Sequence, residues 1–202
     1  MKSTARLEAF SDGVFAIAIT LLILEIKIPH TDAAAQGGLA QALFALWPAY
    51  GAYVLSFVMI GIYWANHHYL YNFYAKTDHA MNLLTVLFLM CISFVPFPTA
   101  ILGQYIMHPE NRRAAAAFYA LGMLLPAASG LLCWWYASHR FRLMDPELSP
   151  TFVRSLTRQF AVSNLIYVAA LAVAFWKPLV SLAICVGLAC LYLRPPPKPV
   201  YR

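Results

Sequence analysis

The sequence predicts an all-helical, polytopic membrane protein with six transmembrane helices per protomer. Of its 202 residues, 62% are hydrophobic and only 11% are charged, which is more apolar surface than one soluble core requires. The apolar residues form runs that Pro residues, charges and aromatic clusters divide, and most runs are long enough for one membrane crossing. A chain of this length leaves no room for an additional folded soluble domain.

The six predicted helices cover residues 7–28, 43–64, 80–106, 114–137, 153–176 and 178–193. The sixth is the shortest, and it follows Lys177-Pro178 after almost no loop. Pro29 comes directly after the first helix, and the small and polar residues around Thr31 to Gly38 predict a flexible loop.

Prolines are expected to disturb two helices and to end the last one. The segment Val95-Pro96-Phe97-Pro98 predicts a kink or a break in the third helix, and Pro126 predicts a bend in the fourth. The proline-rich segment 195–199 cannot continue a helix. We therefore divide the chain into a transmembrane channel domain, residues 1–194, and an extended cytoplasmic tail, residues 195–202.

The positive charges predict the orientation. With the two sides of the membrane alternating from the N-terminus, ten basic residues fall on the first side: Lys2, Arg6, Lys76, Arg140, Arg142, Arg154, Arg158, Arg194, Lys198 and Arg202. Four fall on the other: Lys27, Arg112, Arg113 and Lys177. The positive-inside rule then places both termini in the cytoplasm, in a multi-pass protein of the plasma or inner membrane. The net charge of +6 follows from this topology, so the expected partner is the lipid bilayer and not a nucleic acid.

The first helix carries acids that are costly inside a bilayer. Asp12 and Glu25 enclose the mostly apolar residues 13–24, which cover roughly 18 Å of helix against a hydrocarbon core of about 30 Å. At least one of the two acids must lie near membrane depth. An ionisable group there marks a transport pathway or a structural switch.

A motif at the start of this helix points to a family. Arg6, Phe10, Ser11 and Asp12 form the pattern RxxxFSD, followed by an apolar helix. This pattern resembles the transmembrane protein 175 family of potassium channels, and six predicted helices agree with one family repeat. The resemblance implies the single-repeat bacterial type, a homotetramer whose four first helices line a central pore, potassium as the permeant ion, and no cofactor.

The resemblance also implies how the pore is narrowed. A TVGYG-like loop of carbonyl ligands is absent from the sequence, so selectivity would arise from side chains. In this family, bulky apolar residues after the motif form the constriction; carried over by spacing, they are Ile17, Leu21 and Leu24, with Thr20 as a nearby polar layer. Their helical spacing places them on one face, although the same spacing would also suit packing in a bundle core.

Asp12 lies one residue off this face, so we expect it to contact neighbouring helices. Phe10, Ser11 and Asp12 would form a packing and hydrogen-bonding node, with Arg6 as the charge partner, either six residues away on the same helix or through a neighbouring element. Candidate partners near the same membrane side are Asn66, His67, His68, His79 and Asn82. His67 and His68 are equally compatible with an ordinary polar helix end. Adjacent histidines diverge on a helix, so we expect no metal site.

Glu25 lies at the outer end of the first helix. A ring of four Glu25 side chains could attract cations to an outer mouth of the pore, although Lys27 would weaken that field and plain solvation of a helix end explains the residue as well.

Other classes fit the sequence less well. It has no GxSxG elbow, P-loop, Rossmann glycine pattern or HExxH, so we expect no enzyme. The main alternative is a secondary transporter in which Asp12 carries a proton or cation.

Cysteines and aromatic residues carry structural expectations. We expect all four cysteines, Cys91, Cys133, Cys185 and Cys190, to be buried reduced thiols. Seven aromatic residues near helix ends are expected to be membrane-interface anchors: Trp47, Tyr50, Trp64, Trp134, Trp135, Tyr136 and Trp176.

Overall fold

The computed structural model describes residues 4–29 and 31–201, with the backbone alone for residues 31–37. Regular structure in these ranges is helical apart from two isolated β-bridges. The α-helices are α1 (Ala5–Leu21), α2 (Thr31–Ala45), α3 (Trp47–Tyr71), α4 (His79–Phe94), α5 (Pro96–Tyr105), α6 (Arg112–Ser138), α7 (Pro150–Ala174) and α8 (Pro178–Tyr192). Two 3-10 helices, η1 (Leu22–Glu25) and η2 (His139–Phe141), extend α1 and α6. The all-helical fold class is confirmed.

Prolines and one acid set several helix starts. The helices α5, α7 and α8 each begin with a proline, whose fixed φ suits a first helical position and whose missing N–H would have no partner there. Asp78 caps α4 because its Oδ1 accepts a hydrogen bond of 2.8 Å from the Met81 amide.

The third predicted helix is broken at Pro96, as its prolines predicted. Helix α4 ends at Phe94 and α5 begins at Pro96, with the fully buried Val95 between them. Pro96 has no N–H to give to the preceding turn, and its ring crowds the carbonyl four residues back. Pro126 behaves differently, since it lies inside α6 without ending that helix.

The prediction was wrong between the first two spans. Residues 31–45 form the helix α2 and not a flexible loop, because alanine and glutamine in this segment are good helix formers. Gly38, with φ of 81°, interrupts α2 in a backbone conformation that favours glycine. The second span is accordingly displaced from the predicted 43–64 to α3, which runs seven residues further.

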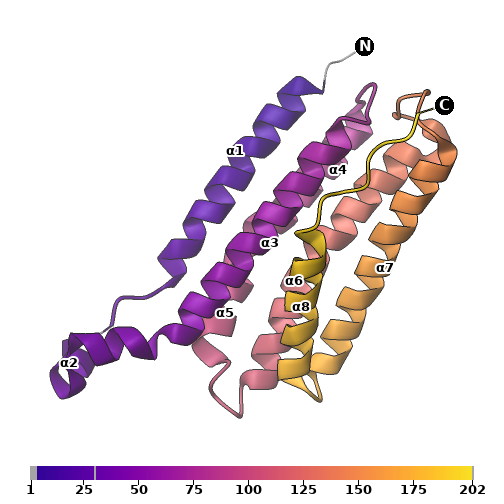
Figure 1. The fold of residues 1–202 in the computed structure, drawn as a ribbon. Helices are drawn as coiled ribbons and strands as arrows, with labels where there is room; N and C mark the ends of the chain where they lie inside the picture. Colours follow the sequence, from indigo (N-terminus) through magenta and orange to yellow (C-terminus); the bar gives the residue numbers. More distant parts are fainter. Residues whose placement is uncertain (1–3, 30, 202) are drawn as a thin grey trace.

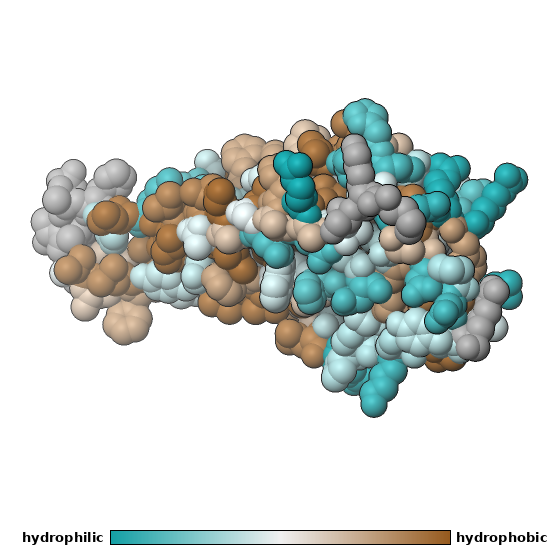
Figure 2. All heavy atoms as spheres, turned by 90° about the horizontal axis from the view of Figure 1, so that it is seen from above, coloured by the Kyte–Doolittle hydropathy of each residue, from teal (hydrophilic) through white to brown (hydrophobic). Residues whose placement is uncertain are grey.

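The helices form a bundle with α1 at one edge (Figure 1). Helix α6 packs against α4, α5, α7 and α8, whereas α1 packs mainly against α4 and α3. Helix α2 projects from the bundle at the end opposite the two chain termini. Figure 2 looks down on the terminal end, where hydrophilic side chains gather over the bundle.

Within the described residues, five helical segments are long and apolar enough to cross a membrane: α1 with η1, α3, α4 with α5, α6 with η2, and α7. The shorter apolar helix α8 has 15 residues, about 22 Å at 1.5 Å per residue. Both described ends of the chain lie at the same end of the bundle, as an even number of crossings requires (Figure 1).

The tail after α8 is extended, and it packs on the bundle. The Ser149 amide donates a 2.8 Å hydrogen bond to the Val200 carbonyl, Leu148 and Tyr201 form a β-bridge, and the Tyr69 hydroxyl donates to the Pro197 carbonyl. The four tail prolines carry no N–H, which reduces the donors that an extended segment must satisfy beside a membrane.

Two side-chain expectations were wrong. Cys91, Cys133 and Cys185 are buried free thiols, but Cys190 is exposed because it lies on the outer face of α8. Trp134 is not an interface anchor, since it is fully buried and its Nε1 donates to Thr157 Oγ1 at 2.8 Å. Its neighbour Trp135 points away from the core and is exposed.

A candidate ion pathway along the first helix

Helix α1 has one face that is fixed by the rest of the protomer. This buried face consists of Ser11, Phe15, Ala18 and Leu22, none of which is more than 3% exposed. Their spacing of four, three and four residues follows one side of a helix. Phe15 makes the main aromatic contacts, with its ring centroid 5.6 Å from that of His67 and 5.9 Å from that of Phe88.

The predicted pore residues lie together on the opposite face. Ile17 is 61% exposed and Leu24 is 63% exposed, with Thr20 and Leu21 between them also exposed. At about 100° per residue, these four side chains fall within roughly a third of the helix circumference. The structure therefore brings the predicted constriction residues together in one mostly apolar stripe that the described side chains leave exposed.

At the end of this stripe, the α-helix changes to the 3-10 helix η1. A 3-10 helix has three residues per turn, so side chains three positions apart lie above one another. Leu24 lies in η1 and Leu21 is the last residue of α1. This change of helix type keeps Leu24 close to the line of Leu21.

Thr20 presents an acceptor and not a donor on this face. Its hydroxyl donates to the carbonyl of Ala16 at 2.8 Å and lies 3.0 Å from the carbonyl of Ile17. Because the proton is used within the helix, the lone pairs of Oγ1 are left to face outward.

Asp12 is held by a residue that we did not predict as its partner. The Trp64 Nε1 of α3 donates to Asp12 Oδ1 at 2.9 Å, and the Trp64 ring stacks on His68 with centroids 6.1 Å apart. Trp64 was expected only as an interface anchor. Its position at helical spacing before His67 and His68 is the signal that could have identified it.

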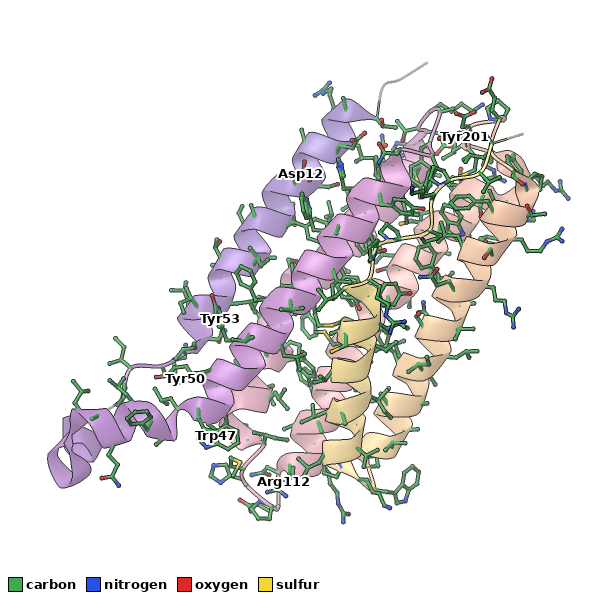
Figure 3. All side chains as sticks on the ribbon, viewed as in Figure 1. Asp12, Trp47, Tyr50, Tyr53, Arg112 and Tyr201 are labelled. Carbon is green, nitrogen blue, oxygen red and sulfur yellow. The ribbon has the colours of Figure 1, made fainter. Side chains whose placement is uncertain are left out.

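Figure 3 places Asp12 on α1 toward the end of the bundle that carries Tyr201, while Trp47 and Arg112 mark the other end. The hydrogen bond to Trp64 therefore fixes α1 to α3 near the terminal end of the bundle. The half of α1 that lies away from the chain termini has no such polar side-chain contact to α3 within the described residues.

The remaining motif residues do not form one node inside the protomer. Ser11 is fully buried, but its hydroxyl donates to the Leu7 carbonyl of its own helix at 2.8 Å. Phe10 is exposed and points away from the bundle. Arg6 is exposed, and it makes no ion pair with Asp12 in the part of the chain that the structure describes. Consecutive helical residues diverge by about 100°, which separates the three motif side chains.

None of the predicted partners hydrogen-bonds to Asp12. His67 is buried between aromatic rings, and His68 and His79 are exposed. Asn66 Nδ2 donates to the Ile62 carbonyl at 2.9 Å, and Asn82 Oδ1 accepts from Thr77 Oγ1 at 2.9 Å.

Glu25 is only half-buried, and it lines a cavity of about 300 Å³ between η1, α3 and α5. Lys27, Gln104 and His108 line the same cavity, and Lys27 Nζ donates to the Leu24 carbonyl at 3.3 Å. The contribution of Glu25 to an outer mouth of the pore stays a prediction. Among the described residues, no group of three or more His, Cys, Asp or Glu side chains is placed to hold a metal ion.

Comparisons with known proteins identify the family. The family described as "Endosomal/lysosomal potassium channel TMEM175" matches residues 6–96, which include the motif, all of α1 but its first residue, and α2, α3 and α4. A potassium channel of Streptomyces collinus is 43% identical over 192 residues, covering 95% of this chain and 92% of that protein.

The structural comparison agrees over nearly the whole chain. The crystal structure of a lysosomal potassium-selective channel TMEM175 homolog from Chamaesiphon minutus matches with a TM-score of 0.85 and 40% identity, covering 94% of this chain and 96% of that one. The human endosomal/lysosomal proton channel TMEM175 is 31% identical over 153 residues, which are 72% of this chain and 30% of the human protein. The chain belongs to the transmembrane protein 175 family of potassium channels, and it is of the single-repeat bacterial type.

Proposed function

We propose that this chain forms a homotetrameric potassium channel in which four α1 helices surround the conduction pathway. The single observation that carries the proposal is the uncovered apolar stripe of Ile17, Leu21 and Leu24 on a helix whose other face is firmly packed. Membership of a channel family supports this function over a transporter in which Asp12 carries the coupled ion, and over any enzyme.

The constriction is apolar. Four Ile17 side chains around an axis would form a ring too narrow and too apolar for a hydrated ion, and such a ring can close by losing its water. Thr20 Oγ1, nearly one turn further along, would replace part of the ion's hydration shell. Selectivity would then depend on how far each cation must dehydrate to pass Ile17.

Asp12 acts in this proposal as an anchor. Its hydrogen bond to Trp64 sets the rotation of α1 about its own axis, and that rotation decides whether Ile17 or a neighbouring residue faces the pathway. Association of the four chains would rely on van der Waals packing and buried polar contacts, because lipid already solvates the apolar surface.

The membrane placement follows the charge asymmetry. Ten basic residues on the side of the termini and four on the other side support cytoplasmic termini in a bacterial inner membrane. With this orientation, Asp12 and Trp64 lie toward the cytoplasm, and Glu25 lies toward the outside.

The test is cation flux through the purified protein in liposomes, with reversal potentials measured for potassium, sodium and caesium. Ile17→Asn should increase potassium current or leak and reduce discrimination among the three ions. Ile23→Asn is the matched control, since it makes the same chemical change on an exposed residue about 120° around the helix. Unchanged conductance and selectivity in Ile17→Asn would refute the constriction, and a reversal potential that follows two coupled species would indicate a transporter.

A further inference from the structure

Helices α6 and α7 share one outer surface, which their pairing defines. They run antiparallel, because Trp134 Nε1 donates to Thr157 Oγ1 at 2.8 Å and, two turns further along, Asn164 Nδ2 donates to the Ala127 carbonyl at 3.2 Å. In an antiparallel pair, the residue that follows each contact turns by about 100° to the same side on both helices. The four residues that follow these contacts are all exposed, and they define the α6–α7 surface: Ala128, Trp135, Arg158 and Leu165.

Most of the α6–α7 surface is apolar. Leu132 of α6 is exposed on it, as are Leu165 and Val168 of α7. No Asp, Glu, Lys or Arg lies within residues 114–138 or 159–176. Both helices are long and apolar enough to cross a membrane, so the acyl chains of lipids are the natural solvent of this surface.

Two arginines lie at one end of the apolar part. Arg154 and Arg158 are exposed and one helical turn apart on α7. Neither guanidinium makes a hydrogen bond or an ion pair with another described residue. Like charges at this spacing disfavour each other on a helix. The protomer therefore places two positive charges together without supplying an anion to neutralise them.

The arginines lie at the depth of a lipid phosphate. Along α7, Arg158 is about 24 Å and Arg154 about 30 Å from the last helical residue, Ala174. The hydrocarbon core of a bilayer is about 30 Å thick. Exposed tryptophans favour the membrane interface, and Trp176 lies just beyond Ala174 while Trp135 lies beside Arg158. Both boundaries of the apolar part are thus marked, with the two guanidinium groups at one of them.

An anionic headgroup complements this arrangement better than a zwitterionic one. The planar guanidinium binds phosphate oxygens through two parallel hydrogen bonds, and one phosphate between two arginines offsets their repulsion. A zwitterionic headgroup would bring a further positive charge to the same place. We propose that the α6–α7 surface binds an anionic glycerophospholipid, with its phosphate on Arg154 and Arg158 and its acyl chains along Leu132 and Leu165.

This lipid site is separate from the candidate ion pathway. Helix α7 lies at the edge of the bundle opposite α1 (Figure 1). Lipid binding is measured without ion flux, so the binding test below and the flux test above fail independently.

The experiment is a titration of the assembled protein in detergent, followed by native mass spectrometry, with dioleoyl phosphatidylglycerol or dioleoyl phosphatidylcholine. The two lipids have the same acyl chains and differ in headgroup charge. We expect one tightly retained phosphatidylglycerol per protomer and weaker retention of phosphatidylcholine. Equal retention of the two lipids overturns the proposal. Displacement of the lipid by millimolar inorganic phosphate would assign the arginines to a free anion, and it overturns the proposal as well.

A double variant and a matched control locate the site. Each basic residue near an anionic lipid surface is worth roughly fivefold in affinity, so Arg154→Gln with Arg158→Gln should weaken phosphatidylglycerol binding about 25-fold. Both positions are exposed, so the fold should be kept. Lys76→Gln with Lys198→Gln removes the same charge from the α3–α4 connection and the tail, at the same end of the bundle (Figure 1), and should retain the lipid. Equal weakening in the two double variants would show an effect of net charge alone and contradict the site.

Discussion

Helices α1 and α6 are both apolar enough to cross a membrane, but the protomer packs them in opposite ways. Half of the most apolar stretch of α6 with η2 is buried by other parts of the chain, against 22% of that of α1 with η1. Helix α6 finds its partners in α4, α5, α7 and α8, while α1 has only one packed side. Apolar content therefore identifies a span, and packing decides whether the span serves the core or faces something outside the protomer.

The largest expected effect contrasts the two adjacent tryptophans of α6. Trp134→Ala should destabilise the protein by about 3–5 kcal/mol, because it empties a fully buried site and removes the hydrogen bond to Thr157. Trp135→Ala, on the exposed side, should cost far less. The thermal denaturation midpoint of the detergent-solubilised protein is the measurement, and equal losses in the two variants would contradict the packing of α6.

Two glycines, Gly122 of α6 and Gly13 of α1, test the difference in packing between these helices. A Cβ at Gly122 of α6 would lie 2.5 Å from Pro98 Cγ, so Gly122→Ala should cost about 1–3 kcal/mol by forcing α5 and α6 apart. A Cβ at Gly13 of α1 meets nothing within 4 Å in the protomer. Gly13→Ala should leave protomer folding intact.

The informative readout for Gly13→Ala is assembly. If α1 meets its copies in a tetramer, this variant should alter the elution volume of the assembly or its potassium flux. A Gly13→Ala protein with normal assembly and flux would place that position against lipid. A harmless Gly122→Ala would instead count against the close approach of α5 and α6.

A smaller effect is expected at the contact that anchors α1. Trp64→Phe removes the donor to Asp12 and should lower stability by about 1 kcal/mol, the usual net contribution of one hydrogen bond. Trp176→Phe is the control, because Trp176 is exposed and its indole N–H makes no hydrogen bond in the described structure. Equal thermal midpoints for the two variants would show that the hydrogen bond between Trp64 and Asp12 does not anchor α1.

The smallest effect concerns pH at the start of α4. Burial alone would raise the pKa of Asp78, but hydrogen bonds from the Met81 amide and the Tyr136 hydroxyl outweigh it and lower that pKa. The folded protein therefore binds the proton less tightly than the unfolded chain, and the cap stabilises the fold above the ordinary aspartate pKa of about 4. This contribution should be lost as the pH falls below that value.

Asp78→Asn should remove most of this acid sensitivity while retaining an acceptor for Met81. Thermal midpoints of the wild type and the variant, measured from pH 6 to pH 3, should converge at the acid end. Parallel curves over that range would exclude Asp78 as the source.

The spans were predictable from sequence because membrane crossings leave long apolar runs and breaks at prolines. The interruption at Pro96 and the grouping of Ile17, Leu21 and Leu24 on one face both follow from local rules of helix geometry. Helix α2 was missed because its two glycines and small residues were interpreted as a loop, and the segment has no clear apolar periodicity that would have marked it as a helix.

Side-chain partners were harder to predict, because they depend on how helices distant in sequence are placed. Asp12 accepts a hydrogen bond from Trp64, 52 residues away. The sequence pattern instead favoured histidines and asparagines on the same side of the membrane as the partners of Asp12. Trp134 and Trp135 are identical in type and adjacent in sequence, yet only Trp134 faces α7, where it contacts Thr157 and Phe160 and is buried.

The central claim is that four α1 helices meet around one axis with Ile17 at the narrowest point. It is tested most directly by Ile17→Cys in a Cys190→Ser background, which leaves only buried native thiols among the four cysteines. Mild oxidation should give disulfide-linked dimers and reduce potassium flux, and a reductant should reverse both effects. Val168→Cys, on the exposed face of α7, should stay monomeric on a denaturing gel. If Ile17→Cys also stays monomeric and its flux is unaffected by oxidation, the four helices do not meet at Ile17 and the account is wrong.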